Sequence, residues 1–276
     1  MSTAAAAPTE ESHDSRPLAL DASQVSVVFG GLIAVNDVSF TIPEGSIVSL
    51  IGPNGAGKTT FFNVLTGLYK PTTGLVRFEG KDITGLAPHK IAQLGMSRTF
   101  QNIRLFGLMT AEENVMVAMH SHMKSSIVGT VLKLPRQRRE EREGREEADA
   151  LLDFVGISHV RGEYARNLSY GDQRRLEVAR ALALKPRVLL LDEPTAGMNP
   201  QESAQFVAFV RRVRDEKRVS ILLIEHDMSV VMRLSERITV LDRGEKIAEG
   251  APDDIKNDQR VIEAYLGKSG AEASGS

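Results

Sequence analysis

The 276-residue sequence predicts an α/β fold, with a parallel sheet between helices, a small antiparallel sheet and an inserted helical subdomain. Three short, continuously apolar runs predict the parallel strands, because strands buried on both faces do not alternate between apolar and polar residues. These runs are Ile47–Gly52, Val188–Glu193 and Ile221–His226, and each ends in polar or glycine residues. Since open α/β sheets bind ligands at the carboxyl ends of their strands, we expect the site there.

The antiparallel sheet is expected in the amino-terminal part of the chain. Val25–Phe29, Val35–Thr41 and Leu75–Phe78 have the length and composition of strands. Turn residues follow the first strand at Gly30-Gly31 and the second at Pro43-Glu44-Gly45. The three segments therefore predict a small subdomain beside the parallel sheet.

Helical patterns occupy the long stretch between the first two apolar runs. Thr110–Glu113 has capping-box spacing and precedes the apolar segment Val115–Met119. The charged segment 139–156 places its apolar residues on one helical face, and Gly156 is expected to end that helix. Those apolar residues are Ala148, Leu151, Leu152 and Val155. We expect this stretch to form a helical subdomain inserted into the α/β core.

Another helix start lies at Leu168–Arg175, LSYGDQRR. Ser169 and Asp172 have the spacing of an N-cap and the third helical position. The segment is interpretable as a capped helix that packs through a following apolar stripe. A hydroxyl and Gly171 at a helix amino terminus also suit an anion. The stripe comprises Leu176, Ala179 and Ala183.

The composition of the chain excludes several classes of protein and of site. The net charge of −2 provides no global basic field for nucleic acid, and no cysteine is present for a disulfide, a thiolate metal site or a nucleophile. No apolar run approaches the ~18 residues of a membrane helix. The basic run Lys133–Arg139 fits a solvated charged segment, or contact with an anionic membrane or a partner.

We expect one folded domain flanked by two tails rich in small and polar residues. Its α/β core is expected to enclose the helical subdomain. The expected boundaries are a disordered tail at 1–19, the core at 20–98 and 176–266, the helical subdomain at 99–175 and a disordered tail at 267–276.

The segment GPNGAGKT, Gly52–Thr59, matches the phosphate-loop pattern GxxxxGK[ST]. Its glycines let backbone N–H groups surround phosphates, Lys58 can reach the β and γ phosphates, and the Thr59 hydroxyl can bind Mg²⁺. An apolar strand precedes the segment and a helix-compatible stretch, 59–68, follows it. This context favours a phosphate loop, and a P-loop NTPase core, over an ordinary glycine-rich turn.

Polar side chains at the ends of the other apolar runs suit the same chemistry. Asp192 and Glu193 are expected to point to opposite faces of their strand, so one can support Mg²⁺ and the other can activate water. His226 can donate a hydrogen bond to the γ phosphate, and Gln101 can complete the Mg²⁺ ligands. Taken alone, each of these residues also fits a structural role.

Two further features of the sequence are candidate ligand contacts. Phe29 can stack on a base or can belong to the core of its strand, and the sequence leaves both open. His120 and His122 resemble a metal pair, but their i, i+2 spacing does not place them on one helical face. We therefore expect no metal site there.

In this order, the motifs resemble those of the nucleotide-binding subunits of ABC transporters over about residues 20–266. The sequence is most similar to the ATPases of branched-chain amino-acid importers, and its insert at 124–140 is similar to the larger ATPase of such pairs. Importers of urea and short amides share much of the pattern. The matching stretches are Phe29–Phe40, Ser97–Phe106, Asn167–Leu182, Glu193–Pro200, Leu222–Met228 and Val261–Gly267.

The resemblance implies a RecA-like ABC cassette that binds ATP and Mg²⁺. It implies that Glu193 is the general base, that His226 and Lys58 assist catalysis, and that Thr59, Gln101 and Asp192 hold Mg²⁺. Phe29 would pack on adenine. The implied nucleotide contacts are Phe29, Val35, Gly52, Pro53, Asn54, Gly55, Ala56, Gly57, Lys58, Thr59, Thr60, Gln101, Ser169, Gly171, Gln173 and Asp192.

The resemblance also implies partners. Ser169 and Gly171 would approach ATP on a second nucleotide-binding subunit, identical or homologous, and a helix of a permease subunit would dock beside 101–106. The cassette would lie at the cytoplasmic face of the cell membrane, act indirectly with a solute-binding protein and bind no nucleic acid. One departure is Asn199, which stands where the broad superfamily carries Asp and removes a charge from that loop.

Other functions remain to be distinguished. A lipid-exporting cassette would keep the same ATPase with the opposite direction of transport. An ABC ATPase of DNA repair or translation would need nucleic-acid elements or a second cassette. A phosphate-loop kinase would share 52–59 but would not need the segment 168–175.

Overall fold

The computed structural model describes residues 15–99, 103–120 and 135–272. Its central sheet has the strand order β10-β9-β3-β8-β7-β6. The strands from β9 to β6 are parallel, and β10 pairs with β9 in an antiparallel hairpin. The bounds are β3 Ile47–Ile51, β6 Met96–Arg98, β7 Val188–Asp192, β8 Ser220–Ile224, β9 Arg237–Asp242 and β10 Glu245–Gly250. The predicted parallel strands are confirmed as the neighbours β3, β8 and β7.

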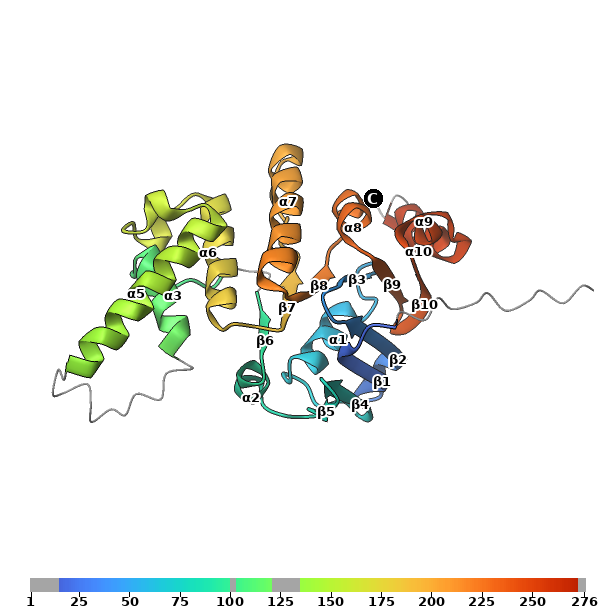
Figure 1. Cartoon of the computed structure of the whole chain (residues 1–276). Helices are drawn as coiled ribbons and strands as arrows, with labels where there is room; N and C mark the ends of the chain where they lie inside the picture. Colours follow the sequence, from blue (N-terminus) through green and yellow to red (C-terminus); the bar gives the residue numbers. More distant parts are fainter. Residues whose placement is uncertain (1–14, 100–102, 121–134, 273–276) are drawn as a thin grey trace, which may run out of the picture.

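A smaller antiparallel sheet packs beside the central one, with the order β2-β1-β4-β5 (Figure 1). The prediction from the three early segments is therefore confirmed. The strands run longer than expected, and a tight turn at Gly30 and Gly31, whose φ angles are positive, joins β1 to β2. The bounds are β1 Leu18–Phe29, β2 Leu32–Pro43, β4 Thr73–Phe78 and β5 Lys81–Asp82.

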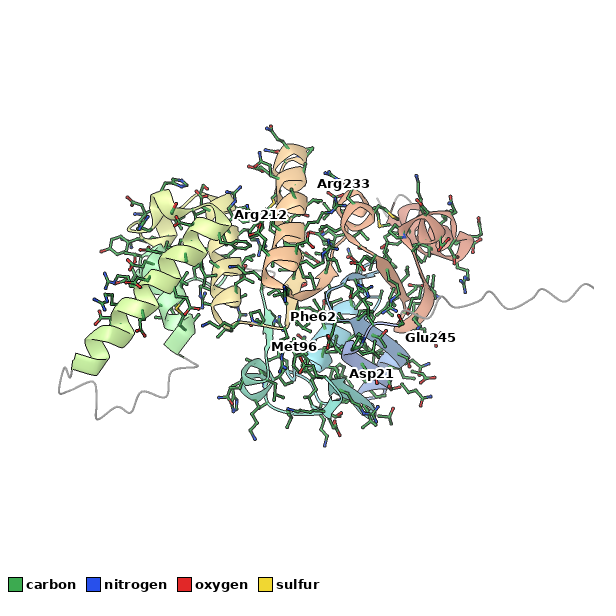
Figure 2. All side chains as sticks on the ribbon, in the orientation of Figure 1. Asp21, Phe62, Met96, Arg212, Arg233 and Glu245 are labelled. Carbon is green, nitrogen blue, oxygen red and sulfur yellow. The ribbon has the colours of Figure 1, made fainter. Side chains whose placement is uncertain are left out.

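The central strands are apolar throughout because each contributes to two cores. On β7, Leu189 and Leu191 face a core shared with helices α6 and α7, whereas Val188 and Leu190 face a core shared with α1 and the antiparallel sheet. Phe62 belongs to the second core and is labelled in Figure 2. The helices concerned are α1 Lys58–Leu65, α6 Tyr170–Ala183 and α7 Pro200–Lys217.

The helical subdomain lies to one side of the sheet in Figure 1 and contains α3, Ala111–His120, and α5, Pro135–Val155. The predicted capping box is present, since Thr110 N–H donates to Glu113 and Glu113 N–H donates to the Thr110 hydroxyl. The predicted apolar face of α5 is buried. Gly156 follows α5 with φ 80°, as expected of a residue that ends a helix.

Two observed boundaries differ from the expected ones. The expected division at 175/176 falls within α6, which is one continuous helix and packs against both α3 and β6. The last helix, α10 Gln259–Glu272, runs beyond residue 266. The remaining helices are α2 Pro88–Gln93, α8 Met228–Leu234 and α9 Pro252–Asn257, with short 3-10 turns at Ser158–Val160 and Ala165–Asn167.

Candidate functional site

The glycine-rich loop joins β3 to α1, and two of its glycines are required by the fold. Gly52 has φ 149°, and a Cβ there would lie 2.1 Å from the carbonyl oxygen of Leu241. Gly57 has φ 95°, and its Cβ would lie 2.5 Å from the carbonyl oxygen of Ala34. Strands of both sheets therefore lie so close to this loop that its backbone leaves no room for a side chain at either position.

The start of α1 suits a phosphate. Gly57 is its N-cap and supplies no side-chain cap, so the first helical N–H groups are not satisfied in that way. Lys58 is only 8% exposed, and its ammonium donates to the carbonyl oxygens of Gly52 at 2.6 Å and Pro53 at 3.0 Å. The loop thus concentrates positive charge and donors at its mouth.

The other loop residues divide by exposure. Asn54, Gly55 and Thr59 are exposed, Thr60 is half-buried, and Pro53 and Ala56 are buried. The Thr59 side chain, the expected Mg²⁺ ligand, is therefore accessible. Gln101 and its neighbour Asn102 lie outside the described residues, as do the His122 position and the segment 121–134.

Strand register brings the expected polar residues to one edge. Ile224 of β8 pairs with both Leu50 of β3 and Asp192 of β7, so the three strands end side by side. The N–H of Glu193 donates to the Ile224 carbonyl at 2.8 Å. The edge predicted from the apolar runs is therefore present.

Asp192 and Glu193 have different surroundings, but the reason differs from the expected one. The strand ends at Asp192, and Glu193 already has a left-handed backbone with φ 46°, so strand alternation does not apply to it. Glu193 Oε1 lies 3.4 Å from His226 Nδ1. The turn, not the pleat, places Glu193 beside His226.

Asp192 is 7% exposed and lies 3.9 Å from the Arg98 guanidinium. Burial raises the pKa of this carboxyl, and Arg98 opposes the shift. The Asp192 carboxylate and the hydroxyl of the exposed Thr59 are the kind of hard oxygen ligands that Mg²⁺ prefers. Among the described residues no group of three or more His, Cys, Asp or Glu side chains could hold a metal.

Glu225, which is not predicted from the sequence, is 1% exposed. One carboxylate oxygen accepts from the N–H of Thr195 at 2.8 Å, and the other accepts from the N–H of His226 at 3.1 Å. Glu225 therefore ties the loop after Glu193 to the loop that carries His226. The only indication in the sequence was an acid directly after a fully apolar strand.

Phe29 and Val35 were both expected at the nucleotide. Phe29 is 46% exposed and contacts the Tyr69 ring edge-on at a centroid distance of 5.4 Å, so the core alternative is wrong. Val35 is 0% exposed and packs near Gly57 and Gly244. It therefore shapes the loop from behind and offers a ligand no surface in this structure.

The amino terminus of α6 is capped as predicted. The Ser169 hydroxyl accepts from the Asp172 N–H at 3.2 Å and donates to its carboxylate at 2.7 Å. The Gln173 amide donates to the carbonyls of Ala165 and Leu168, so it holds the preceding loop. Gly171 has open space where a Cβ would lie.

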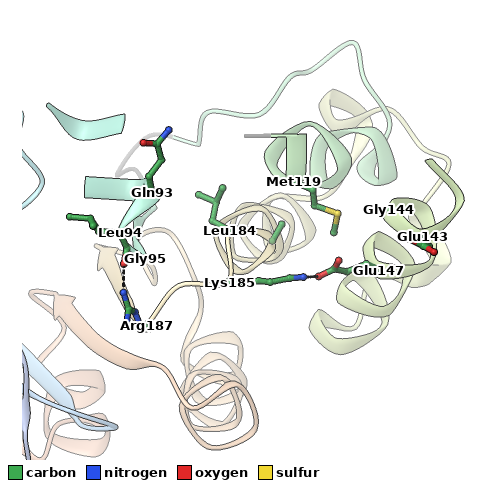
Figure 3. Close-up of a pocket in the computed structure, with 11 residues that line it drawn as sticks. Gln93, Leu94, Gly95, Met119, Glu143, Gly144, Glu147, Leu184, Lys185 and Arg187 are labelled. Atoms are coloured by element: carbon green, nitrogen blue, oxygen red, sulfur yellow. Dashed lines mark hydrogen bonds and ion pairs between the residues drawn. The ribbon is translucent and has the colours of Figure 1, made fainter. Parts of the chain in front are cut away.

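A groove of about 550 Å³ lies between the helical subdomain and the sheet. Figure 3 shows the ion pair of Lys185 with Glu147, 2.8 Å long, between its two sides. Met119 of α3 and Leu184 after α6 line it, and Gly95 contributes from the segment before β6.

A glycine-rich loop between a parallel strand and a helix, with carboxylates at the adjacent strand ends, defines a phosphate-loop nucleotide-binding protein. The chain belongs to the ABC transporter family, whose family model matches residues 35–196. A second model, described as branched-chain amino acid ATP-binding cassette transporter, matches residues 245–271. Proteins of this family hydrolyse ATP to power transport.

Curated relatives match along nearly their whole length. The high-affinity branched-chain amino acid transport ATP-binding protein BraF of Pseudomonas aeruginosa is 49% identical over 92% of this chain and 100% of its own. LivG of Escherichia coli K12, described in the same words, is 46% identical with the same coverage. No helix in the described part of this chain is long and apolar enough to cross a membrane.

Solved ABC cassettes share the fold. The ADP conformation of MJ1267, an ATP-binding cassette of an ABC transporter, has a TM-score of 0.78 and 30% identity, covering 91% of this chain and 99% of that one. A dimeric post-hydrolysis state of the cassette MJ0796 bound to ADP and Pi has a TM-score of 0.71 and 26% identity, covering 84% and 98%.

Proposed function

We propose that the chain is the ATP-hydrolysing subunit of an importer of branched-chain amino acids. The observation that carries this proposal is the 49% identity to BraF over 92% of the chain, joined by the carboxyl-terminal match at 245–271. The nucleotide would bind at the loop 52–59, where Lys58 and the start of α1 meet phosphate charge. The exposed Phe29 would stack on adenine.

Glu193 is the proposed general base. Its carboxylate would accept a proton from the attacking water, and His226, 3.4 Å away, would donate to the γ phosphate. Lys58 and backbone N–H groups would stabilise the developing phosphate charge. Thr59, Asp192 and Gln101 would hold Mg²⁺, which neutralises phosphate charge when bound.

The proposed working unit is a dimer with permease subunits. The Ser169 and Gly171 end of α6 would complete the site of the second cassette, as the open space at Gly171 allows. A permease helix would dock beside residues 101–106, which would place the cassette at the cytoplasmic face of the membrane. A solute-binding protein would deliver the amino acid to the permease.

Glu193→Gln tests this proposal. The variant should bind ATP as the wild type does but lose nearly all turnover, by at least about a thousandfold, because the amide cannot accept the proton. Nucleotide affinity, phosphate release and uptake of labelled leucine by cells lacking the wild-type protein would be measured. Wild-type turnover in the variant would remove Glu193 from the role of base.

The same cells distinguish the substrate classes. Leucine uptake restored by the wild-type chain, with urea uptake unchanged, supports the amino-acid importer. Urea uptake restored in place of leucine uptake would assign the chain to the short-amide importers. If neither uptake is restored while phosphate release is intact, the chain is still an ATPase, but its assignment to the import of these solutes is overturned.

A further inference from the structure

Tyr170 is the first residue of α6 and lies between Ser169 and Gly171, yet its side chain turns away from both. Its hydroxyl donates to the carbonyl oxygen of Ala196 at 2.8 Å. The ring also lies over Gly197, since a Cβ added there would sit 3.8 Å from Cε1 of the tyrosine. Tyr170 thus joins α6 to the loop that follows Glu193.

That loop carries the proposed base at its start. The N–H of Ala196 donates to the Glu193 carbonyl at 3.2 Å. Ala196 therefore connects the tyrosine hydrogen bond to the Glu193 backbone. The left-handed φ of Glu193 makes its side-chain direction depend on this turn. A shift of Ala196 would therefore change where the Glu193 carboxylate points.

The other end of the link is packed against the helical subdomain. Helix α6 contacts α3 and α5, and its residues Leu176 and Ala179 are fully buried in the core that these helices share. Tyr170 itself is 45% exposed, and such a surface hydrogen bond contributes little to folding. The contact therefore serves to position the loop after Glu193, and it contributes little to the stability of the core.

We propose that Tyr170 is a positioning residue for hydrolysis, whose hydroxyl couples the orientation of α6 to the direction of Glu193. This inference rests on the proposed dimeric ATPase. In that dimer, the α6 end that faces one nucleotide would set the base of the other site.

The test is Tyr170→Phe, which removes the hydroxyl and keeps the ring on Gly197. The matched control is Tyr164→Phe, because Tyr164 is 48% exposed in the same subdomain and its hydroxyl makes no side-chain hydrogen bond within the described part of the chain. The purified full chains would be assayed for kcat, KM for ATP and folding by circular dichroism.

We expect Tyr170→Phe to lower kcat about fivefold or more while KM for ATP stays within about twofold, the signature of a contact used in the transition state. The control should match the wild type in both. A kcat within twofold of the wild type in Tyr170→Phe would overturn the proposal.

A second measurement separates positioning from assembly. In the Glu193→Gln background, Tyr170→Phe should leave the ATP-dependent dimer intact by light scattering, since its effect is on the base. Loss of that dimer would make Tyr170 an assembly residue and overturn the inference. Normal turnover in Glu193→Gln alone would instead refute the assignment of the base, whatever Tyr170 does.

Discussion

At the scale of single residues, two aspartates of the chain have different electrostatic environments. Asp192 is buried, and burial raises the pKa of its carboxyl. Asp215 on α7 lies at the surface, where its hydrogen bond to Arg214 lowers the pKa of its carboxyl. These opposite directions predict opposite effects of neutralising each acid.

Asp192→Asn should abolish Mg²⁺-dependent hydrolysis and yet stabilise the free protein more as the pH rises. The folded pKa of Asp192 lies above its ordinary value of 3.8, so ionisation costs the wild type stability once the pH exceeds 3.8. The asparagine variant has no carboxyl to ionise and so does not lose this stability. Arg98 keeps its hydrogen bonds to Asn63 and Thr66. Urea unfolding at pH 4.5 and pH 7.5 would measure the difference.

Asp215→Asn is the control for that experiment. Its folded pKa is lowered, so its contribution to stability is present above the ordinary value and is lost as the pH falls. The asparagine variant should therefore become less stable relative to the wild type as the pH rises from about 2.5 to about 4.5, and the difference between them should stay nearly constant between pH 4.5 and pH 7.5. If the stability of Asp192→Asn relative to the wild type also stayed constant between pH 4.5 and pH 7.5, burial would not be the cause assigned at Asp192.

At the scale of elements, α5 shows why a strongly charged helix is stable in this fold. Its apolar stripe of Ala148, Leu151, Leu152 and Val155 is buried against α3 and α6. The charged residues face outward, and several form exposed ion pairs, which contribute little. The stability of this element therefore depends on packing.

Leu152→Ala should lower the free energy of unfolding by about 2–5 kcal/mol, because Leu152 is fully buried and leaves a cavity. Leu108→Ala makes the same change at a residue that is 74% exposed and should alter it by less than about 0.5 kcal/mol. Urea unfolding compares the two. An equal loss of unfolding free energy in the two variants would show that the apolar stripe does not stabilise the helical subdomain.

At the scale of the whole molecule, the glycines are of two kinds: some are required by the fold of the chain itself, and one is explained by the proposed assembly with a partner. Gly52 and Gly57 have no room for a side chain within the chain itself. Gly171 has room and an ordinary backbone, so the monomer gives no reason for a glycine there. A requirement for glycine at 171 would come from something that approaches α6 from outside, as the proposed dimer demands.

Gly171→Asp should therefore leave folding and ATP binding by the monomer unchanged and should remove ATP-dependent dimerisation, with turnover lowered by about a hundredfold or more. Gly162→Asp is the control, since Gly162 also has open space and ordinary backbone angles. Light scattering with ATP and phosphate release measure the effect. Normal hydrolysis by Gly171→Asp would refute the shared site.

The sequence by itself determined the parts of this protein that depend on local pattern. Continuous apolar runs predicted β3, β7 and β8, and capping spacing predicted the starts of α3 and α6, because these properties depend on residues a few positions apart. The phosphate-loop motif was predicted for the same reason. The roles of its individual residues in nucleotide binding remain predictions.

Only the tertiary structure decided what depends on contacts between distant segments. It placed Glu225 between the loops of Thr195 and His226, Arg98 beside Asp192, and the Tyr170 hydroxyl on Ala196. It also showed that Phe29 is exposed while Val35 is buried, although both lie on strands of similar composition. Burial and orientation are set by which elements meet in space, and spacing along one chain does not carry that information.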